Sequence, residues 1–180
     1  MADTGGTGRL IGFRALFAGL ALAILFFRLL PLQALPSGWA PPDLIVALAF
    51  AWVLRRPDYV PALLLGAVMC LADLLLQRPP GLWAALVVLG AEALRARAGD
   101  LREVGFLFEW LTVGLVLVGI TLAYRLALAA TGVGQAPLGL TAVQLFSTLA
   151  IYPVVVLISH LMLGVRKAAT GEIDERGRRL

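Results

Sequence analysis

The sequence contains little of what a water-soluble protein needs at its surface. Charged residues make up only 14% of the 180 residues, whereas hydrophobic residues make up 61%. Soluble globular proteins carry about 25% charged and about 45–50% apolar residues. A domain of this size cannot hide such an excess in one water-facing core, because polar groups must cover its surface. The composition therefore argues against a soluble enzyme and favours a protein whose surface faces lipid.

Side chains for cross-linking, metal binding and nucleophilic catalysis are also scarce. Cys70 is the one cysteine, so the chain has no internal disulfide and no CxxC motif, and we expect Cys70 to be a small buried side chain. His160 is the one histidine and lacks the partner ligands that zinc needs, so we expect it to make a polar contact between helices. Ser147 and Ser159 have no GxSxG context, and no HExxH motif occurs. We expect no enzymatic activity, no cofactor and no metal.

Six apolar segments divide the chain: 10–30, 43–54, 59–76, 80–94, 104–130 and 138–164. Crossing a bilayer takes about 20 residues, with a range of about 17–25. The first, third, fifth and sixth segments satisfy this length. The second and fourth are short, and each could be tilted in a thinned bilayer or be partly re-entrant. The first is too long for a signal peptide and is interpreted as a retained membrane helix.

The sequence therefore predicts an all-α integral membrane protein, a bundle of six transmembrane helices. We expect a cytoplasmic N-terminal tail at 1–9, the helical domain at 10–164 and a cytoplasmic C-terminal tail at 165–180. Proline and glycine turns separate the apolar segments, as in "PLQALPSGWAPP" and "QRPPG".

The basic residues predict the orientation of this bundle. The net charge of +4 does not indicate nucleic-acid binding, because Lys and Arg form short clusters between apolar runs rather than a basic stripe. If all six segments span, Arg28 and Arg78 lie outside, while Arg14 and Arg125 lie within helices. The remaining basic residues lie on the cytoplasmic side: Arg9, Arg55, Arg56, Arg95, Arg97, Arg102, Arg166, Lys167, Arg176, Arg178 and Arg179. This bias predicts that both termini are cytoplasmic.

Five charged side chains fall near the outer ends of the predicted helices. They are Asp43, Asp73, Arg28, Arg78 and Arg125. Ionisable residues in a membrane span are costly and mark interior contacts or function. Two carboxylates could serve acid–base catalysis. We favour a structural role, in which each pairs with an arginine or reaches the interface, and we expect Asp43, after two prolines, to cap its helix.

Three other features predict helix contacts. Near the cytoplasmic end, the sequence places Arg14, Glu92, Glu109 and His160. Small residues at spacings of three and four form one face of the first helix, which would let an internal helix or a second protein approach closely; they are Gly12, Ala15, Gly19 and Ala23. The tryptophans fall near predicted span ends, as in an interfacial belt; they are Trp39, Trp52, Trp83 and Trp110.

An ordered set of residues between positions 42 and 94 resembles the rod-shape-determining MreD family of bacteria. Pro42-Asp43-Leu44 opens a helix, a helix containing Gly66 ends in Asp73, and Pro80-Gly81 opens the next helix. The details "RRPDYVP" and "RPPGLWA" resemble alphaproteobacterial members. The sequence departs at "RPPG", where many members have a small-residue turn before Pro-Leu-Gly.

The resemblance implies a non-enzymatic scaffold or regulator of the elongation machinery that builds the lateral cell wall. It implies MreC as the main partner, with RodA, a class B penicillin-binding transpeptidase and MreB nearby, in the inner membrane. It also implies a fold similar to the S-components of energy-coupling-factor transporters. The alternative is therefore a small-molecule-binding transport component, for which Gln144, Thr148, Tyr152 and Ser159 are candidate pocket residues.

Overall fold

The computed structural model describes residues 4–30, 40–103, 105–163 and 165, with the side chains of 4–6 and 102–103 excepted. In these ranges all regular structure is helical. The elements are α1 (Thr4–Leu29), α2 (Leu44–Arg55), a 3-10 turn η1 (Pro57–Tyr59), α3 (Ala62–Leu75), α4 (Leu82–Ala96), α5 (Asp100–Glu103), α6 (Phe106–Ala130) and α7 (Leu138–Leu161). The predicted C-terminal tail, apart from Val165, and Trp39 lie outside the described residues.

Three of these helices are long and apolar enough to cross a membrane: α1 over Thr7–Leu29, α6 and α7. The prediction that the third apolar segment also reaches spanning length is wrong, because α3 has only 14 residues. Its prolines explain the shortening. Pro57 opens η1 and Pro61 is the N-cap of α3, and neither can donate a backbone N–H to a continuing helix.

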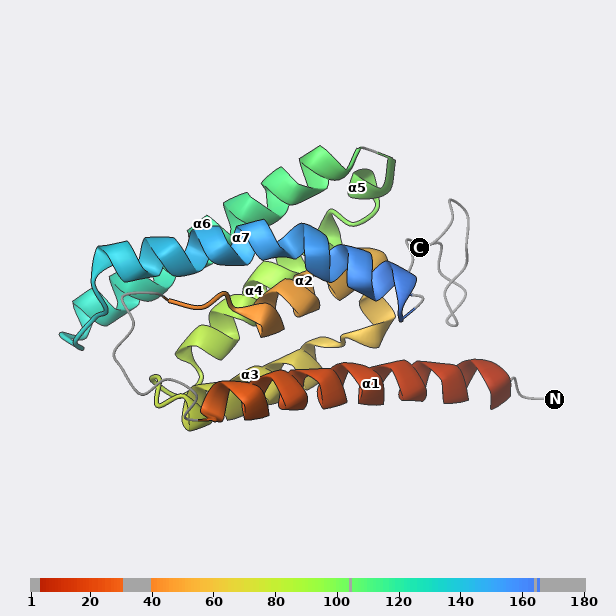
Figure 1. The fold of residues 1–180 in the computed structure, drawn as a ribbon, viewed down its shortest axis with the longest axis horizontal. Helices are drawn as coiled ribbons and strands as arrows, with labels where there is room; N and C mark the ends of the chain where they lie inside the picture. Colours follow the sequence, from red (N-terminus) through yellow and green to blue (C-terminus); the bar gives the residue numbers. More distant parts are fainter. Residues whose placement is uncertain (1–3, 31–39, 104, 164, 166–180) are drawn as a thin grey trace.

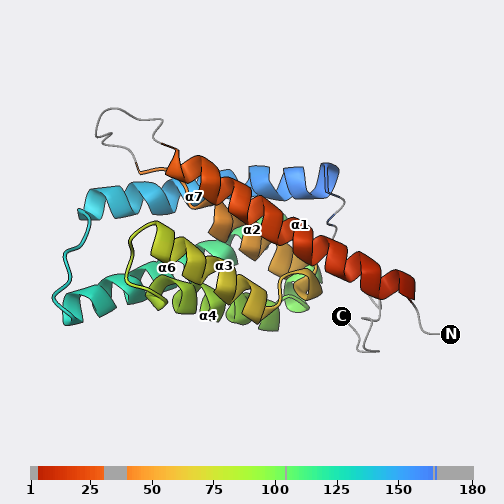
Figure 2. The same cartoon turned by 90° about the horizontal axis from the view of Figure 1, so that it is seen from below.

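The helices run alternately along the long axis of the molecule, and α1 begins at the end where α7 finishes (Figure 1). They form three layers. α1 and α3 make one outer layer, α2 and α4 the middle, and α6 and α7 the other outer layer, with packing contacts between α3 and α4, α2 and α7, and α4 and α6. Viewed after a 90° turn, α1 lies along one side of the bundle beside α2 and α3 (Figure 2).

α2 is the core of the bundle. Each residue from Ile45 to Arg55 is buried. At about 1.5 Å per residue, a helix this short covers about 18 Å, well under the bilayer core of about 30 Å. Because its neighbours enclose it, the length of α2 need not match the bilayer. Gly90 of α4 permits this close packing, since a Cβ there would lie 3.1 Å from Phe50 Cζ and 3.0 Å from Val116 Cγ1.

The outward faces carry large apolar side chains. Leu63 on α3 is 89% exposed, and α6 and α7 also expose leucines and phenylalanines along their lengths. Such continuous apolar surface is what contact with lipid requires. The expectation of a buried Cys70 is wrong, since it lies on the exposed face of α3. The residues on both sides of Cys70 in the sequence are apolar, so the sequence alone did not show which face of α3 points inward.

The expected tryptophan belt is wrong for two of its members. Trp52 is fully buried, and its indole N–H donates to Ser159 Oγ at 3.0 Å. Trp83 is 9% exposed and lies over Tyr124 in an edge-on contact. Both belong to the two middle-layer helices, whose ends are covered by neighbouring helices rather than by an interface.

A proline inside α7 explains the position of Trp110. Pro153 cannot donate to the carbonyl four residues earlier, at Leu149. The indole N–H of Trp110 on α6 donates to that oxygen at 2.9 Å. The contact replaces the missing intrahelical bond and ties α6 to α7.

Candidate functional site

Asp43 joins α2 to α7 at one end of the bundle. As predicted, it caps α2: its Oδ1 accepts from the N–H of Val46 at 3.4 Å. Its own N–H donates to Thr148 Oγ1 at 2.8 Å, and the Thr148 hydroxyl donates to Gln144 O at 2.6 Å. Asp43 thereby caps α2 and ties it to the middle of α7, and the Pro-Pro-Asp order prepares this by fixing the chain ahead of α2.

Two arginines approach the Asp43 carboxylate from other elements. Arg28 ends α1, and its Nη1 lies 3.9 Å from Asp43 Oδ2. Arg78 follows α3, and its Nη1 lies 3.6 Å from the same oxygen. The chain reaches this position by turning through Gln77 at φ 55°, with the N–H of Arg78 donating to Asp73 O at 2.9 Å. The structure thus brings together three of the five predicted charges as an ion-paired cluster.

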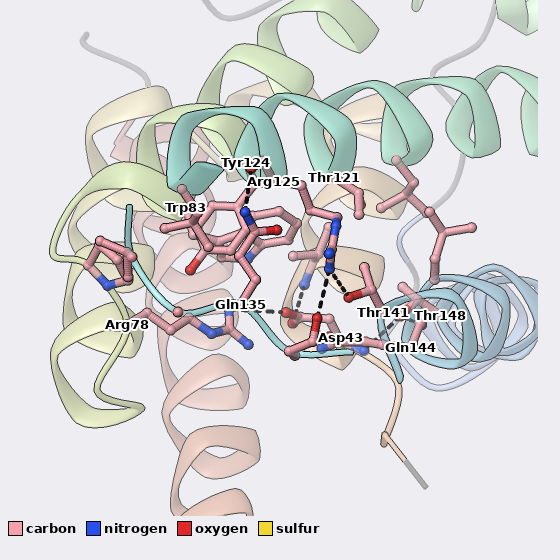
Figure 3. A pocket seen from close by; sticks show the side chains of 18 of the residues that line it. Asp43, Arg78, Trp83, Thr121, Tyr124, Arg125, Gln135, Thr141, Gln144 and Thr148 are labelled. Carbon is pink, nitrogen blue, oxygen red and sulfur yellow. Dashed lines mark hydrogen bonds and ion pairs between the residues drawn. The ribbon is translucent and has the colours of Figure 1, made fainter. Parts of the chain in front are cut away.

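A cavity of about 320 Å³ lies beside this cluster (Figure 3). Asp43, Arg78 and Arg125 all line it. The other lining residues are Val46, Gln77, Pro79, Trp83, Leu117, Thr121, Tyr124, Leu128, Val133, Gly134, Gln135, Ala136, Thr141, Gln144, Leu145 and Thr148. Sequence reasoning named Gln144 and Thr148 as candidate pocket residues but not the other walls, which come from α2, the α3–α4 turn, α4, α6 and the α6–α7 turn.

Arg125 lies on the α6 wall of the cavity. Its Nη1 donates to Thr141 Oγ1 at 2.8 Å and to Ala136 O at 3.0 Å, so it holds the α6–α7 turn. Gln135 Nε2 donates back to Arg125 O at 3.1 Å. Both acceptors of the guanidinium are neutral, and within the described residues no carboxylate lies within ion-pair distance of it.

Asp73 differs from the expectation that it pairs with an arginine. Its side chain is fully buried, and Oδ2 accepts from the N–H of Ala84 at 3.1 Å. Ala84 lies in the first turn of α4, where backbone N–H groups lack helical partners. The Asp73 carboxylate therefore joins the end of α3 to the start of α4. The ion pairs of Arg28 and Arg78 go to Asp43 instead.

The other end of the bundle contains a buried polar group that sequence reasoning missed. Arg55 Nη1 lies 2.8 Å from Glu109 Oε1, and the Tyr152 hydroxyl donates to the same oxygen at 2.8 Å. Arg55 also donates to Ala51 O. The sequence assigned Arg55 to a cytoplasmic basic cluster. Arg56 follows Arg55 directly, so the two looked like one basic cluster in the sequence. In the structure only Arg55 is buried.

The remaining residues predicted at this end do not form one cluster. Glu92 pairs with Arg95 of its own helix, three residues away. Arg14 Nε donates to Asp58 O at 3.0 Å. His160 is exposed, so the expected polar contact between helices is wrong there. The neighbouring Ser159 makes that contact, because it faces Trp52 on the inner side of α7.

Gly19 lies on the outside of the protein. It is exposed, as are Gly12, Ala15 and Ala23, and a Cβ at Gly19 would meet nothing within 4 Å. Within the described residues, the small-residue face of α1 therefore packs against no other helix. The sequence left open an internal helix or a second protein as the partner, and no internal helix covers this face in the described part of the chain.

These clusters position helices and offer hydrogen bonds around a cavity. Within the described residues, no group of three or more His, Cys, Asp or Glu side chains could hold a metal ion. Comparison with models of known protein families, with curated proteins and with solved structures found no match.

Proposed function

We propose that this protein is a multi-pass inner-membrane protein of the MreD type, a non-enzymatic scaffold or regulator of lateral cell-wall synthesis that acts with MreC. The observation that carries the proposal is where the motif residues lie. Asp43 caps α2, Asp73 accepts from the start of α4, and Gly81 is the N-cap of α4 with φ 81°. Asp43, Asp73 and Gly81 thus lie at or near helix ends, which supports a likeness to the family in architecture.

In this proposal α1, α2, α3, α4, α6 and α7 all cross the membrane, with both termini in the cytoplasm. The alternating course of the helices supports an even number of crossings (Figure 1). Arg28, Arg78 and Arg125 lie toward one end, whereas a larger set lies toward the other: Arg9, Arg14, Arg55, Arg56, Arg95 and Arg97. This excess supports a cytoplasmic location for the second end. The short α3 and α4 cross with the help of their turns in a locally thinned bilayer.

MreC is the proposed partner in the membrane. The exposed small-residue face around Gly19 allows a single membrane helix to approach α1 closely. RodA, the class B penicillin-binding transpeptidase and MreB are proposed as further members of the same assembly. Lipid covers the remaining apolar faces.

Depletion of the protein in its own bacterium tests this role. We expect rod-shaped cells to widen and round up, and labelled wall precursor to be lost from the side wall while septal incorporation continues. A plasmid copy of the wild-type gene is the control and should restore both. Slow growth at unchanged cell width and unchanged side-wall labelling would contradict the scaffold role.

The transport alternative has one observation in its favour. Gln144 and Thr148, two of its four candidate pocket residues, line the cavity. The other two are engaged elsewhere: Tyr152 bonds Glu109, and Ser159 accepts from Trp52. The scaffold role is therefore better supported. Transport would be favoured if excess nutrient, rather than restored wall synthesis, relieved the growth defect of depleted cells.

A further inference from the structure

The cavity beside Asp43 has the size and walls of a ligand site. Its volume of about 320 Å³ is at the lower end of the range for small-molecule pockets, about 300–1,000 Å³. Leu117, Leu128 and Leu145 make an apolar wall, while Thr121 and Gln144 add hydrogen-bonding groups. Figure 3 shows these polar side chains gathered around one space between α6 and α7.

Positive charge exceeds negative charge at this site. Asp43 is the one carboxylate that lines the cavity, and two guanidiniums, Arg28 and Arg78, share it. The buried Asp73 also lies near Arg78, so two carboxylates balance these two guanidiniums. Arg125 adds a third cation, which in the described part of the chain bonds only the neutral oxygens of Ala136 and Thr141.

Arg125 also has donors to spare. A guanidinium has five N–H groups in a planar fork, and both described bonds of Arg125 come from Nη1. Nη2 and Nε make no hydrogen bond within the described residues. A charged donor that lines a cavity in a largely apolar bundle is costly unless an anion accepts from it.

The aromatic wall adds a second unsatisfied donor. The guanidinium of Arg78 lies over the Trp83 ring, 5.7 Å from its centroid. The indole N–H of Trp83 is buried and has no hydrogen-bond partner among the described residues. Trp83 and Tyr124 pack edge to face, so their rings form an aromatic corner of the cavity next to the two cationic side chains.

We propose that this cavity binds a phosphate-bearing ligand, with Arg125 and Arg78 donating to the phosphate oxygens and the organic part lying against Trp83, Tyr124 and the leucines. Phosphate suits the site better than a single carboxylate, because its several acceptor oxygens can engage two guanidiniums at once. The ligand is either the headgroup of an anionic phospholipid or a soluble phosphorylated compound. The inference does not depend on the role in wall synthesis.

Equilibrium binding to the full-length protein in neutral detergent tests the proposal. The probes are dihexanoyl phosphatidylglycerol, glycerol 3-phosphate and, as the ligand without phosphate, dihexanoylglycerol. We expect at least one phosphate probe to raise the melting temperature in a concentration-dependent way, while dihexanoylglycerol does not. Tighter binding of the phosphatidylglycerol identifies a lipid headgroup, and equal or tighter binding of glycerol 3-phosphate identifies a soluble ligand.

A variant pair assigns the binding to the cavity. Arg125→Gln should lower the affinity for the phosphate probe by about tenfold or more, as expected for loss of a charge-assisted hydrogen bond. Arg97→Gln, an exposed arginine at the other end of α4, should bind as wild type does. Equal binding by Arg125→Gln and wild type would overturn the proposal. If Arg125→Gln does not fold, the probes on the wild-type protein still test the proposal. It would be overturned if dihexanoyl phosphatidylglycerol and dihexanoylglycerol changed the melting temperature equally. It would also be overturned if neither phosphate probe changed the melting temperature.

Discussion

Arg55 and Glu109 form an ion pair inside the bundle, with 2.8 Å between Nη1 and Oε1 and side chains 6% and 0% exposed. The pair joins the end of α2 to the start of α6, and Tyr152 of α7 donates to the same carboxylate oxygen. Three helices are therefore fixed to one another through one oxygen atom. Charges so far from water are stable only together, because each alone would keep its full desolvation penalty.

The first prediction follows from this dependence. Glu109→Gln keeps the shape and an acceptor for Tyr152 but leaves the Arg55 cation without its carboxylate partner, so we expect a loss of about 3–5 kcal/mol in unfolding free energy. The double variant Arg55→Met/Glu109→Gln should recover part of that loss. Thermal unfolding in detergent measures both.

Glu92→Gln is the matched control for this pair. Glu92 is 44% exposed and its partner Arg95 belongs to the same helix, so we expect a loss under about 1 kcal/mol. Equal losses for Glu92→Gln and Glu109→Gln would show that the Arg55–Glu109 pair does not hold the helices together.

A second prediction concerns Trp110 and Pro153. Trp110→Phe removes the N–H that serves Leu149 O, and an unsatisfied buried carbonyl costs about 1–3 kcal/mol. In a Pro153→Ala background, the new N–H at position 153 can donate to Leu149 O, so the same Trp110→Phe change should cost less. A double-mutant cycle by thermal unfolding gives the coupling. Additive effects of the two substitutions would contradict the compensation.

The third prediction concerns Asp73. Asp73→Ala removes the acceptor at the start of α4 and should cost about 0.5–2 kcal/mol, as for other lost helix caps. Asp73→Asn keeps an oxygen there and should cost less. The control is Asp100→Ala, at an exposed position in the short α5. A charge swap between Asp73 and Arg78 should not restore stability, and a full rescue would mean that an ion pair, rather than the cap, is the main contact.

The fourth prediction is topological. Cys70→Ala gives a background without cysteine, into which Gly99→Cys and Gly134→Cys can be introduced at exposed positions with nothing within 4 Å. In spheroplasts, whose inner membrane is intact, a membrane-impermeant maleimide should label position 134 and not position 99. After the inner membrane is permeabilised, both should react. Labelling of both positions before permeabilisation would contradict the six-crossing arrangement.

Helix boundaries were the most predictable part of the fold. The sequence predicts 43–54, 104–130 and 138–164, and the structure has α2, α6 and α7 at nearly the same bounds. Proline, glycine and charge mark these ends locally. α3 was predicted too long because the apolar residues around Pro61 resemble a continuing helix until the missing backbone donor is considered.

Side-chain partners were less predictable than helix ends. The cap at Asp43 follows from local sequence, since cap and helix are neighbours along the chain. The partner of Glu109 is 54 residues away, and the Thr148 hydroxyl is 105 residues from Asp43. In a chain apolar on every face, periodicity does not tell which side of a helix faces inward. The helix end at which a charge lies was therefore predictable, but its partner was not.

Co-purification with MreC tests the central claim most directly. The tagged protein, extracted from its own bacterium in mild detergent, should retain MreC. Gly19→Leu should fold as wild type does, since no described residue contacts that face, yet retain less MreC. Gly119→Leu, an equally open position on α6, should retain MreC as wild type does. Absence of MreC from a well-folded wild-type preparation would contradict the proposed scaffold role.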